Sequence, residues 1–336
     1  MVGQERECHR PLLHVPEAIP TPTTGCWRDA SFPARTQAGN DAGTDVMIYE
    51  SAAAWRAAPE KRVLLFGMSG LGKTHVSAML RREGGWFHYS VDYRIGTRYM
   101  GEHIADSVKA EAMKVPYLAS LLRSDSIYIG SNITFQNLAP LSTYLGKPGD
   151  PEKGGLAFEE YRRRQALHRQ AEVASMLDTP YFIDRAKRLY GIGDFVCDSS
   201  GSLCEVVDPQ DPGDPVLTVL RDNLLIVWIE GTEAHTQALI ERFDRDPKPM
   251  CYDEAFLEAA WADYLAGSGD APVEVDPDAF VRWAYARALA HRQPRYRAIA
   301  ENWGVTVPAE EIASITSPRD FTEAVARALE DRGETA

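Results

Sequence analysis

A glycine-rich segment near residue 70 has the spacing of a loop that binds phosphate groups. Gly67 is followed by four residues and then by Gly72, Lys73 and Thr74, which is the pattern of a phosphate-binding loop. Its glycines let the backbone present N–H groups to phosphate oxygens with no Cβ atom in the way. The lysine then neutralises the β- and γ-phosphates, and the threonine hydroxyl coordinates Mg²⁺. The segment therefore predicts binding of a nucleoside triphosphate with Mg²⁺.

The sequence on either side of this loop fits the same interpretation. Val63–Phe66 is a continuous apolar run, typical of a central parallel strand. Residues 74–82 repeat apolar side chains at helical spacing, and a helix starting near Lys73 directs the positive end of its dipole at the phosphates. The residues expected to bind the nucleotide are Gly67, Ser69, Gly70, Leu71, Gly72, Lys73 and Thr74. ATP is the expected nucleotide, although the residues alone leave GTP open.

Two further apolar runs end in an aspartate. Asp92 follows the run Trp86–Val91, and Asp198 follows Asp194–Cys197. A strand-end aspartate next to a phosphate loop orients or deprotonates an acceptor hydroxyl, or holds Mg²⁺. We expect the first role for Asp92 and the second for Asp198, together with Thr74. The alternative is a capping aspartate and a polar turn.

Arginines follow two of the expected strands. Arg94 and Arg98 lie one helical turn apart behind Asp92, and we expect them to grip an anionic substrate. Arg242 and Arg245 follow the strand Leu224–Ile229, and we expect them to close over the phosphates and stabilise charge in the transition state. The alternative for all four is a solvated cation, which at a helix end is favoured by the dipole.

Composition narrows the class of protein. The formal net charge of the 336-residue chain is −13, which argues against a broad nucleic-acid surface. The five cysteines have neither zinc-knuckle nor Cys-x-x-Cys spacing, so they predict reduced thiols in a cytoplasmic protein. No apolar run is long enough to cross a bilayer, and no membrane association is expected.

The chain divides into three expected regions. Residues 1–46 are rich in proline and lack a persistent period, which predicts a disordered extension. Residues 47–98 and 191–336 supply the nucleotide-binding core, with the short run Val305–Val307 as a fifth strand. Because helical patterns separate the strands, the predicted class is α/β with a mainly parallel sheet. Residues 99–190 are too long for a simple crossover and predict a helical insertion at the ligand-binding edge of the sheet.

The sequence predicts the N-termini of three helices. Thr179 before Pro180 and Asp276 before Pro277 each predict an N-cap followed by proline at the first helical position. Asp320 with Glu323 predicts a capping box for the last helix. 

The order of these parts resembles the small-molecule and nucleoside-monophosphate kinase branch of the phosphate-loop proteins, in the style of shikimate and gluconate kinases. The resemblance covers residues 61–98, 194–250 and 304–331. It implies a three-layer fold with strand order 2-3-1-4-5, Asp92 at the acceptor, Arg242 and Arg245 in a lid, and adenine near residues 315–318. The chain departs from that branch in its longer helical insertion and in a lid with fewer arginines.

Two functions follow as expectations. The first is transfer of the γ-phosphate of ATP to a small metabolite or nucleotide, with Lys73, Asp92, Arg242 and Arg245 as catalytic residues. The second is a regulatory or switch-type ATPase that acts through a protein partner. The amino-acid sequence of residues 90–99 and 295–304 also resembles bacterial proteins labelled only as ATPases. The sequence names no phosphate acceptor.

Overall fold

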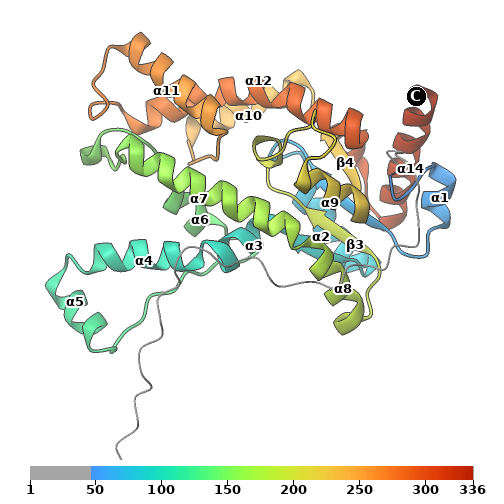
Figure 1. The fold of residues 1–336 in the computed structure, drawn as a ribbon, viewed down its shortest axis with the longest axis horizontal. Coiled ribbons are helices and arrows are strands. Elements are labelled where there is room, and N and C mark those ends of the chain that lie inside the picture. Colours follow the sequence, from blue (N-terminus) through green and yellow to red (C-terminus); the bar gives the residue numbers. More distant parts are fainter. Residues whose placement is uncertain (1–46, 336) are drawn as a thin grey trace, which may run out of the picture. The chain divides into compact units, whose positions relative to one another are not determined.

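The fold is built around one parallel sheet. The computed structural model describes residues 47–335, so the expected extension at residues 1–46 lies outside the described residues. The strands are β1 (Arg62–Phe66), β2 (Phe87–Ser90), β3 (Phe195–Asp198), β4 (Leu225–Glu230) and β5 (Gly304–Pro308). All neighbouring pairs are parallel, and their order is β2-β3-β1-β4-β5 (Figure 1). The predicted α/β class, the five strands and their order are confirmed.

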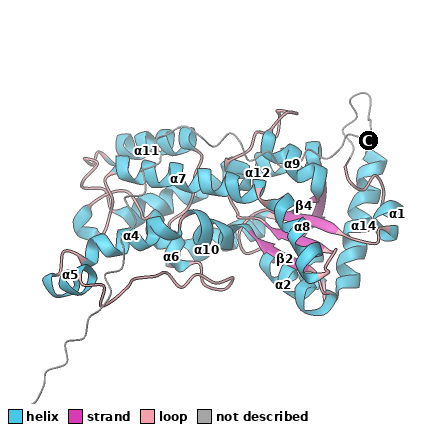
Figure 2. Ribbon diagram, turned by 60° about the horizontal axis from the view of Figure 1, so that its bottom comes forward, coloured by secondary structure: helices cyan, strands magenta, loops and turns pink. Residues whose placement is uncertain are grey.

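Helices cover both faces of this sheet, and others lie beyond its carboxyl edge. The helices of the described residues are α1 (Ala52–Ala57), α2 (Lys73–Gly84), α3 (Val91–Arg94), α4 (Gly101–Ala112), α5 (Pro116–Arg123), α6 (Ala139–Leu145), α7 (Phe158–Leu177), α8 (Thr179–Tyr190), α9 (Pro215–Asn223), α10 (Glu233–Arg245), α11 (Glu254–Ser268), α12 (Pro277–Trp303), α13 (Ala309–Ser314) and α14 (Pro318–Thr335). Helices α2 and α14 pack together on one face, while α8, α9 and α12 contact the strands from the other (Figure 2). This division follows from right-handed crossovers that run in opposite directions from β1.

The register of the sheet aligns the ends of three strands. Asp198, the last residue of β3, pairs with Leu65 of β1 and with Ser90 of β2. Parallel strands end at the same edge, so the phosphate loop after β1 and the residues after β2 and β3 meet there. Helix α3 starts directly at Val91, with the Ser90 hydroxyl accepting a hydrogen bond from the Tyr93 N–H. The second strand is therefore one residue shorter at each end than predicted.

The three predicted helix starts have different outcomes. Asp276 caps α12, and its carboxylate accepts hydrogen bonds from the N–H groups of residues 278 and 279, as predicted. Thr179 is wrong as an N-cap, because it is the first residue of α8 and Asp178 precedes it. The Asp320 capping box is also wrong: α14 starts at Pro318, and the Asp320 N–H donates to the Ser317 hydroxyl. Proline is the second residue of α8 and the first residue of α14. Because proline is tolerated in the first turn, each helix starts earlier than predicted.

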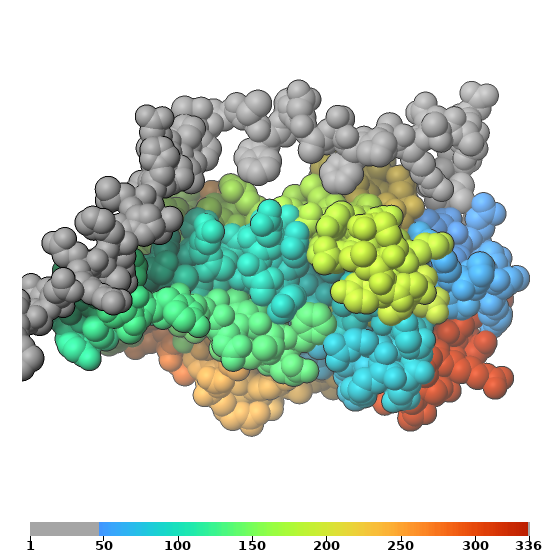
Figure 3. All heavy atoms as spheres, turned by 90° about the horizontal axis from the view of Figure 1, so that it is seen from below, coloured from blue at the N-terminus to red at the C-terminus, as the bar shows by residue number. Residues whose placement is uncertain are grey.

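A group of helices lies beyond the carboxyl edge of the sheet. It contains α4 to α7 from the predicted insertion, but α11 also belongs to it, because the Phe158 and Trp261 rings stack at 4.6 Å. The segment after α5 returns to the sheet, where the Phe135 ring packs on His88 and Tyr93. Figure 3 shows this green segment beside α2. The helical group is therefore assembled from two stretches of chain, of which the sequence predicted only one.

No helix among residues 47–335 combines the length and the apolar character that crossing a bilayer requires.

Candidate functional site

The phosphate loop holds its conformation through glycine backbone geometry. Gly67 has φ of +134°, and a Cβ atom there would lie 2.7 Å from the carbonyl oxygen of Ile229 on β4. Gly72 has φ of +97° and precedes α2 without a side-chain cap. Only glycine accepts both constraints. The loop therefore turns tightly against β4 and leaves the first N–H groups of α2 open to an anion.

Lys73 bends back over this loop. Its ammonium group donates hydrogen bonds to the carbonyl oxygens of Gly67 at 2.8 Å and Met68 at 3.0 Å. The side chain is buried, and that burial lowers the pKa of Lys73, while the carboxylates of Asp198 and Asp92 oppose the shift. A buried ammonium beside two carboxylates is a charge arrangement suited to a phosphate chain and a divalent cation.

A cavity of about 300 Å³ opens at this loop. Its lining combines loop residues with both predicted strand-end aspartates: Ser69, Gly70, Gly72, Lys73, Thr74, His75, Asp92, Asp198, Ser199 and Gly201. The structure thus brings together the phosphate loop, Thr74, Asp92 and Asp198. Gly67 and Leu71 complete the loop behind this lining and are buried. Thr74 and the two carboxylates supply the oxygen ligands that Mg²⁺ prefers.

The two aspartates differ in their surroundings. Burial raises the pKa of Asp92 to about 6, the nearby Asp198 carboxylate adds to the shift, and Lys73 opposes it. Asp198 lies 3.6 Å from Nε2 of the buried His88. Asp92 therefore presents a carboxyl group of raised pKa to the loop, which is a property of a general base near neutral pH.

A second cavity, of about 850 Å³, adjoins the first and shares Ser69, Asp92 and Gly201 with it. Its other walls come from the α5–α6 segment, α7, the loop after β3, α10 and α12. The polar side chains among its lining are Gln136, Asn137, Ser142, Thr143, His168, Ser200, Ser202, Arg242, Asp246, Lys248, Tyr285 and Arg292. A volume of this size suits a metabolite rather than a water molecule.

The four predicted arginines have different positions. Arg242 reaches the loop from α10, since a Cβ atom on Gly70 would lie 2.9 Å from its Nη2 atom. Arg245, one turn further, is exposed and lines neither cavity. Arg94 forms an ion pair with Asp178, 2.7 Å from Nη2 to Oδ2. Arg98 is exposed on a π-helical turn and also lines neither cavity. Of the four, only Arg242 joins the loop.

Several site residues escaped the sequence analysis. His168 and Glu172 lie on α7. Its many charged residues favour a solvent-exposed helix, yet both side chains are buried. Arg292 on α12 is buried in an ion pair with Glu205, with 2.5 Å between Nε and Oε1. The four-residue spacing of His168 and Glu172 was the only available signal, and it does not reveal burial.

Comparison with known proteins adds little beyond the fold. No protein-family model matches the chain, and no curated protein matches it. Among solved structures, shikimate kinase from Bacteroides thetaiotaomicron is similar at 14% sequence identity, with a TM-score of 0.35, over 80% of this chain and 97% of that chain. A likeness this low assigns the chain to no family. Its own structure has a five-stranded parallel sheet of order β2-β3-β1-β4-β5, with a glycine-rich phosphate loop between β1 and α2.

The raised pKa of Asp92 predicts a pH effect on stability. Its pKa of about 6 in the folded state lies above the ordinary value near 3.8. The folded state therefore holds the proton more tightly, and this group lowers stability as pH rises from about 4 to 6, with no further change above that. In urea unfolding, Asp92→Asn should lack this decline, gaining about 3 kcal/mol relative to the wild type across the window.

Asp263→Asn, at an exposed position of α11, is the matched control and should follow the wild-type pH profile. Parallel profiles for wild type and Asp92→Asn would contradict the raised pKa.

Proposed function

We propose that the protein transfers the γ-phosphate of ATP to a small-molecule acceptor. One observation carries the proposal: the cavity at the phosphate loop opens beside a second, larger cavity that several polar side chains line, and Asp92 lines both. Hydrolysis needs only a water molecule, whereas transfer needs a site for an acceptor next to the γ-phosphate. A shared carboxylate between the two cavities is the arrangement that transfer requires.

The proposed reaction assigns a role to each residue around the loop. The loop N–H groups and Lys73 bind the phosphates, and Thr74 with Asp198 holds Mg²⁺, which supplies charge neutralisation when bound. Asp92, largely ionised at neutral pH, orients the acceptor hydroxyl and accepts its proton. The acceptor oxygen forms a bond to the γ-phosphorus as the bond to the β,γ-bridging oxygen breaks. The products are a phosphorylated acceptor and ADP.

Arg242 completes the proposed charge arrangement. Its guanidinium group lies against Gly70, so it is within reach of phosphate oxygens held by the loop. The remaining sequence-based assignments, Arg245 in the lid and Arg94 with Arg98 at the substrate, stay predictions. Arg94 is engaged in an ion pair with Asp178, and neither Arg98 nor Arg245 lines either of the two cavities. Arg242 lines the larger cavity and lies against Gly70, which favours it over the other three.

A regulatory ATPase that acts through a protein partner is the second candidate. It is favoured by exposed aromatic side chains on the helical group, where Tyr117 is 71% and Tyr128 is 92% exposed. Exposed aromatic residues are enriched at protein interfaces. This candidate leaves the larger cavity without a role, which is why we place it second.

The measurement that separates the two candidates is ADP formation from Mg·ATP by the purified full chain. It is run alone and with a pool of protein-free cytosolic metabolites. We expect the pool to stimulate ADP formation strongly and Lys73→Ala to abolish it, because the lysine neutralises the transferred phosphate. Slow turnover that ignores the pool would contradict the proposal and favour the regulatory ATPase.

Two arginine variants on α10 test the charge arrangement. Arg242→Ala should lower kcat by at least about 100-fold, because an arginine on the transferring phosphate stabilises transition-state charge. Arg245→Ala, one turn along the same helix, should stay close to wild type. Equal losses in both variants would restore the sequence-based pair of lid arginines, and no loss in either would remove Arg242 from the mechanism.

A further inference from the structure

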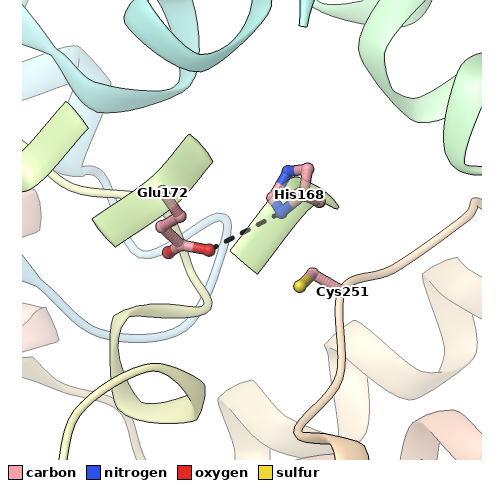
Figure 4. A group of neighbouring side chains, drawn as sticks. All are labelled: His168, Glu172 and Cys251. Atoms are coloured by element: carbon pink, nitrogen blue, oxygen red, sulfur yellow. Dashed lines mark ion pairs between the residues drawn. The ribbon is translucent and has the colours of Figure 1, made fainter. Parts of the chain in front are cut away.

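Three side chains of the types that bind transition metals meet in the wall of the larger cavity. His168 and Glu172 come from α7, and Cys251 comes from the segment between α10 and α11 (Figure 4). One ligand atom from each lies within 4.8 Å of the other two, and all three residues are buried. His168 and Cys251 line the cavity. None of the three has a role in the phosphate transfer proposed above.

Helix α7 fixes the relative position of the first two side chains. His168 and Glu172 are four residues apart, so they project from the same face of α7. Their Nδ1 and Oε2 atoms lie 3.7 Å apart. That is too long for a hydrogen bond but close to the separation of two ligands on one ion.

The cysteine is held against this face by a bracket of hydrogen bonds. The Gln165 side chain, one turn before His168 on α7, donates to the carbonyl oxygen of Met250 at 2.8 Å and accepts from the N–H of Tyr252 at 3.0 Å. The backbone is thus fixed on both sides of Cys251. Arg292 adds a hydrogen bond to the Cys251 carbonyl oxygen at 2.5 Å. A buried amide used in this way aligns the thiol with α7.

The carboxylate is also oriented. The hydroxyl groups of Ser200 and Ser202 donate to Glu172, with Ser202 Oγ 2.8 Å from Oε2. Both serines belong to the loop that follows Asp198. Hydrogen bonds of this kind from a second layer of residues orient ligands around metal ions.

An unsatisfied atom points to a missing partner. Among the described residues, nothing forms a hydrogen bond with the buried Nδ1 of His168. Buried polar atoms are nearly always satisfied, since leaving one unpaired costs free energy. An imidazole nitrogen that lacks a hydrogen-bond partner is available as a metal ligand.

We propose that His168, Glu172 and Cys251 bind a divalent transition-metal ion of the zinc type, with a fourth coordination position open to the larger cavity. Imidazole, thiolate and carboxylate together select zinc or cobalt over Mg²⁺, which takes oxygen ligands. Binding displaces the thiol proton of Cys251 to solvent and, where Glu172 is protonated, its proton as well. The two anions then balance the charge of the ion.

The spacing agrees with such a site. Zinc bonds of about 2.0–2.3 Å in a tetrahedral site separate their ligand atoms by roughly 3.3–3.6 Å. The histidine–glutamate pair is at 3.7 Å, and the remaining atoms, within 4.8 Å, need only a side-chain rotation to close. Three protein ligands with one open position is the arrangement of reactive rather than purely structural zinc sites. The open position would receive an oxygen of the acceptor, a role that rests on the proposed function, whereas metal binding itself does not.

The test is a titration of the metal-free, nucleotide-free full chain with CoCl₂, followed by absorption spectroscopy. We expect one equivalent to produce thiolate-to-cobalt charge-transfer absorption in the near-ultraviolet and the visible bands of a four-coordinate ion. Cys251→Ser should remove the charge-transfer absorption and weaken binding at least about 100-fold, because it deletes a direct ligand. Gln165→Ala should weaken binding about 10-fold while the absorption persists, because it removes only the bracket.

Cys204→Ala, which removes another buried cysteine, is the matched control and should bind cobalt like the wild type. Circular dichroism checks that each variant is folded, and His168→Gln gives a second ligand deletion if Cys251→Ser is not. A wild-type titration without charge-transfer absorption would overturn the proposal. So would a spectrum that survives Cys251→Ser but is lost on changing Cys8 and Cys26 to serine. Because ATP is absent, these outcomes are independent of phosphate transfer.

Discussion

The parallel pairing of β3 between β1 and β2 is the constraint on which the site depends. Because Asp198 pairs with Leu65 on one side and Ser90 on the other, three chain segments leave the sheet at one edge. The phosphate loop, the start of α3 with Asp92, and the serine-rich loop after Asp198 are thereby brought to one cavity. A shift of β3 by one residue would turn the Asp198 side chain to the opposite face and leave the phosphate loop facing Asp92 alone.

The charged side chains that the sheet brings together, Lys73, Asp92 and Asp198, alter one another's electrostatic environment. Lys73 is buried and held by loop carbonyl groups, while Asp92 and Asp198 approach it as carboxylates. Repulsion between the two carboxylates and burial raise the pKa of Asp92. In the proposed reaction, a magnesium–nucleotide complex would place a cation next to the two carboxylates and phosphate groups next to the lysine.

The sequence predicted the parts that depend on local patterns. The five strands, their order and the loop from Gly67 to Thr74 follow from apolar runs, from glycine spacing and from the resemblance in the order of the parts. The features that the sequence did not predict depend on tertiary packing. The cluster of His168, Glu172 and Cys251 joins residues about 80 positions apart through the Gln165 bracket, and no periodicity encodes such a contact. Arg94 was expected at the substrate, but its partner Asp178 lies far along the chain.

In the proposed reaction the γ-phosphate passes to an acceptor in the adjoining cavity and not to water. The most direct measurement follows the fate of that phosphate by ³¹P NMR and mass spectrometry, during turnover with the metabolite pool in ¹⁸O-enriched water. We predict a new phosphate ester that accumulates in step with ADP and contains no solvent oxygen in its phosphoryl group. Inorganic phosphate carrying one solvent ¹⁸O, in amounts equal to ADP, would contradict it.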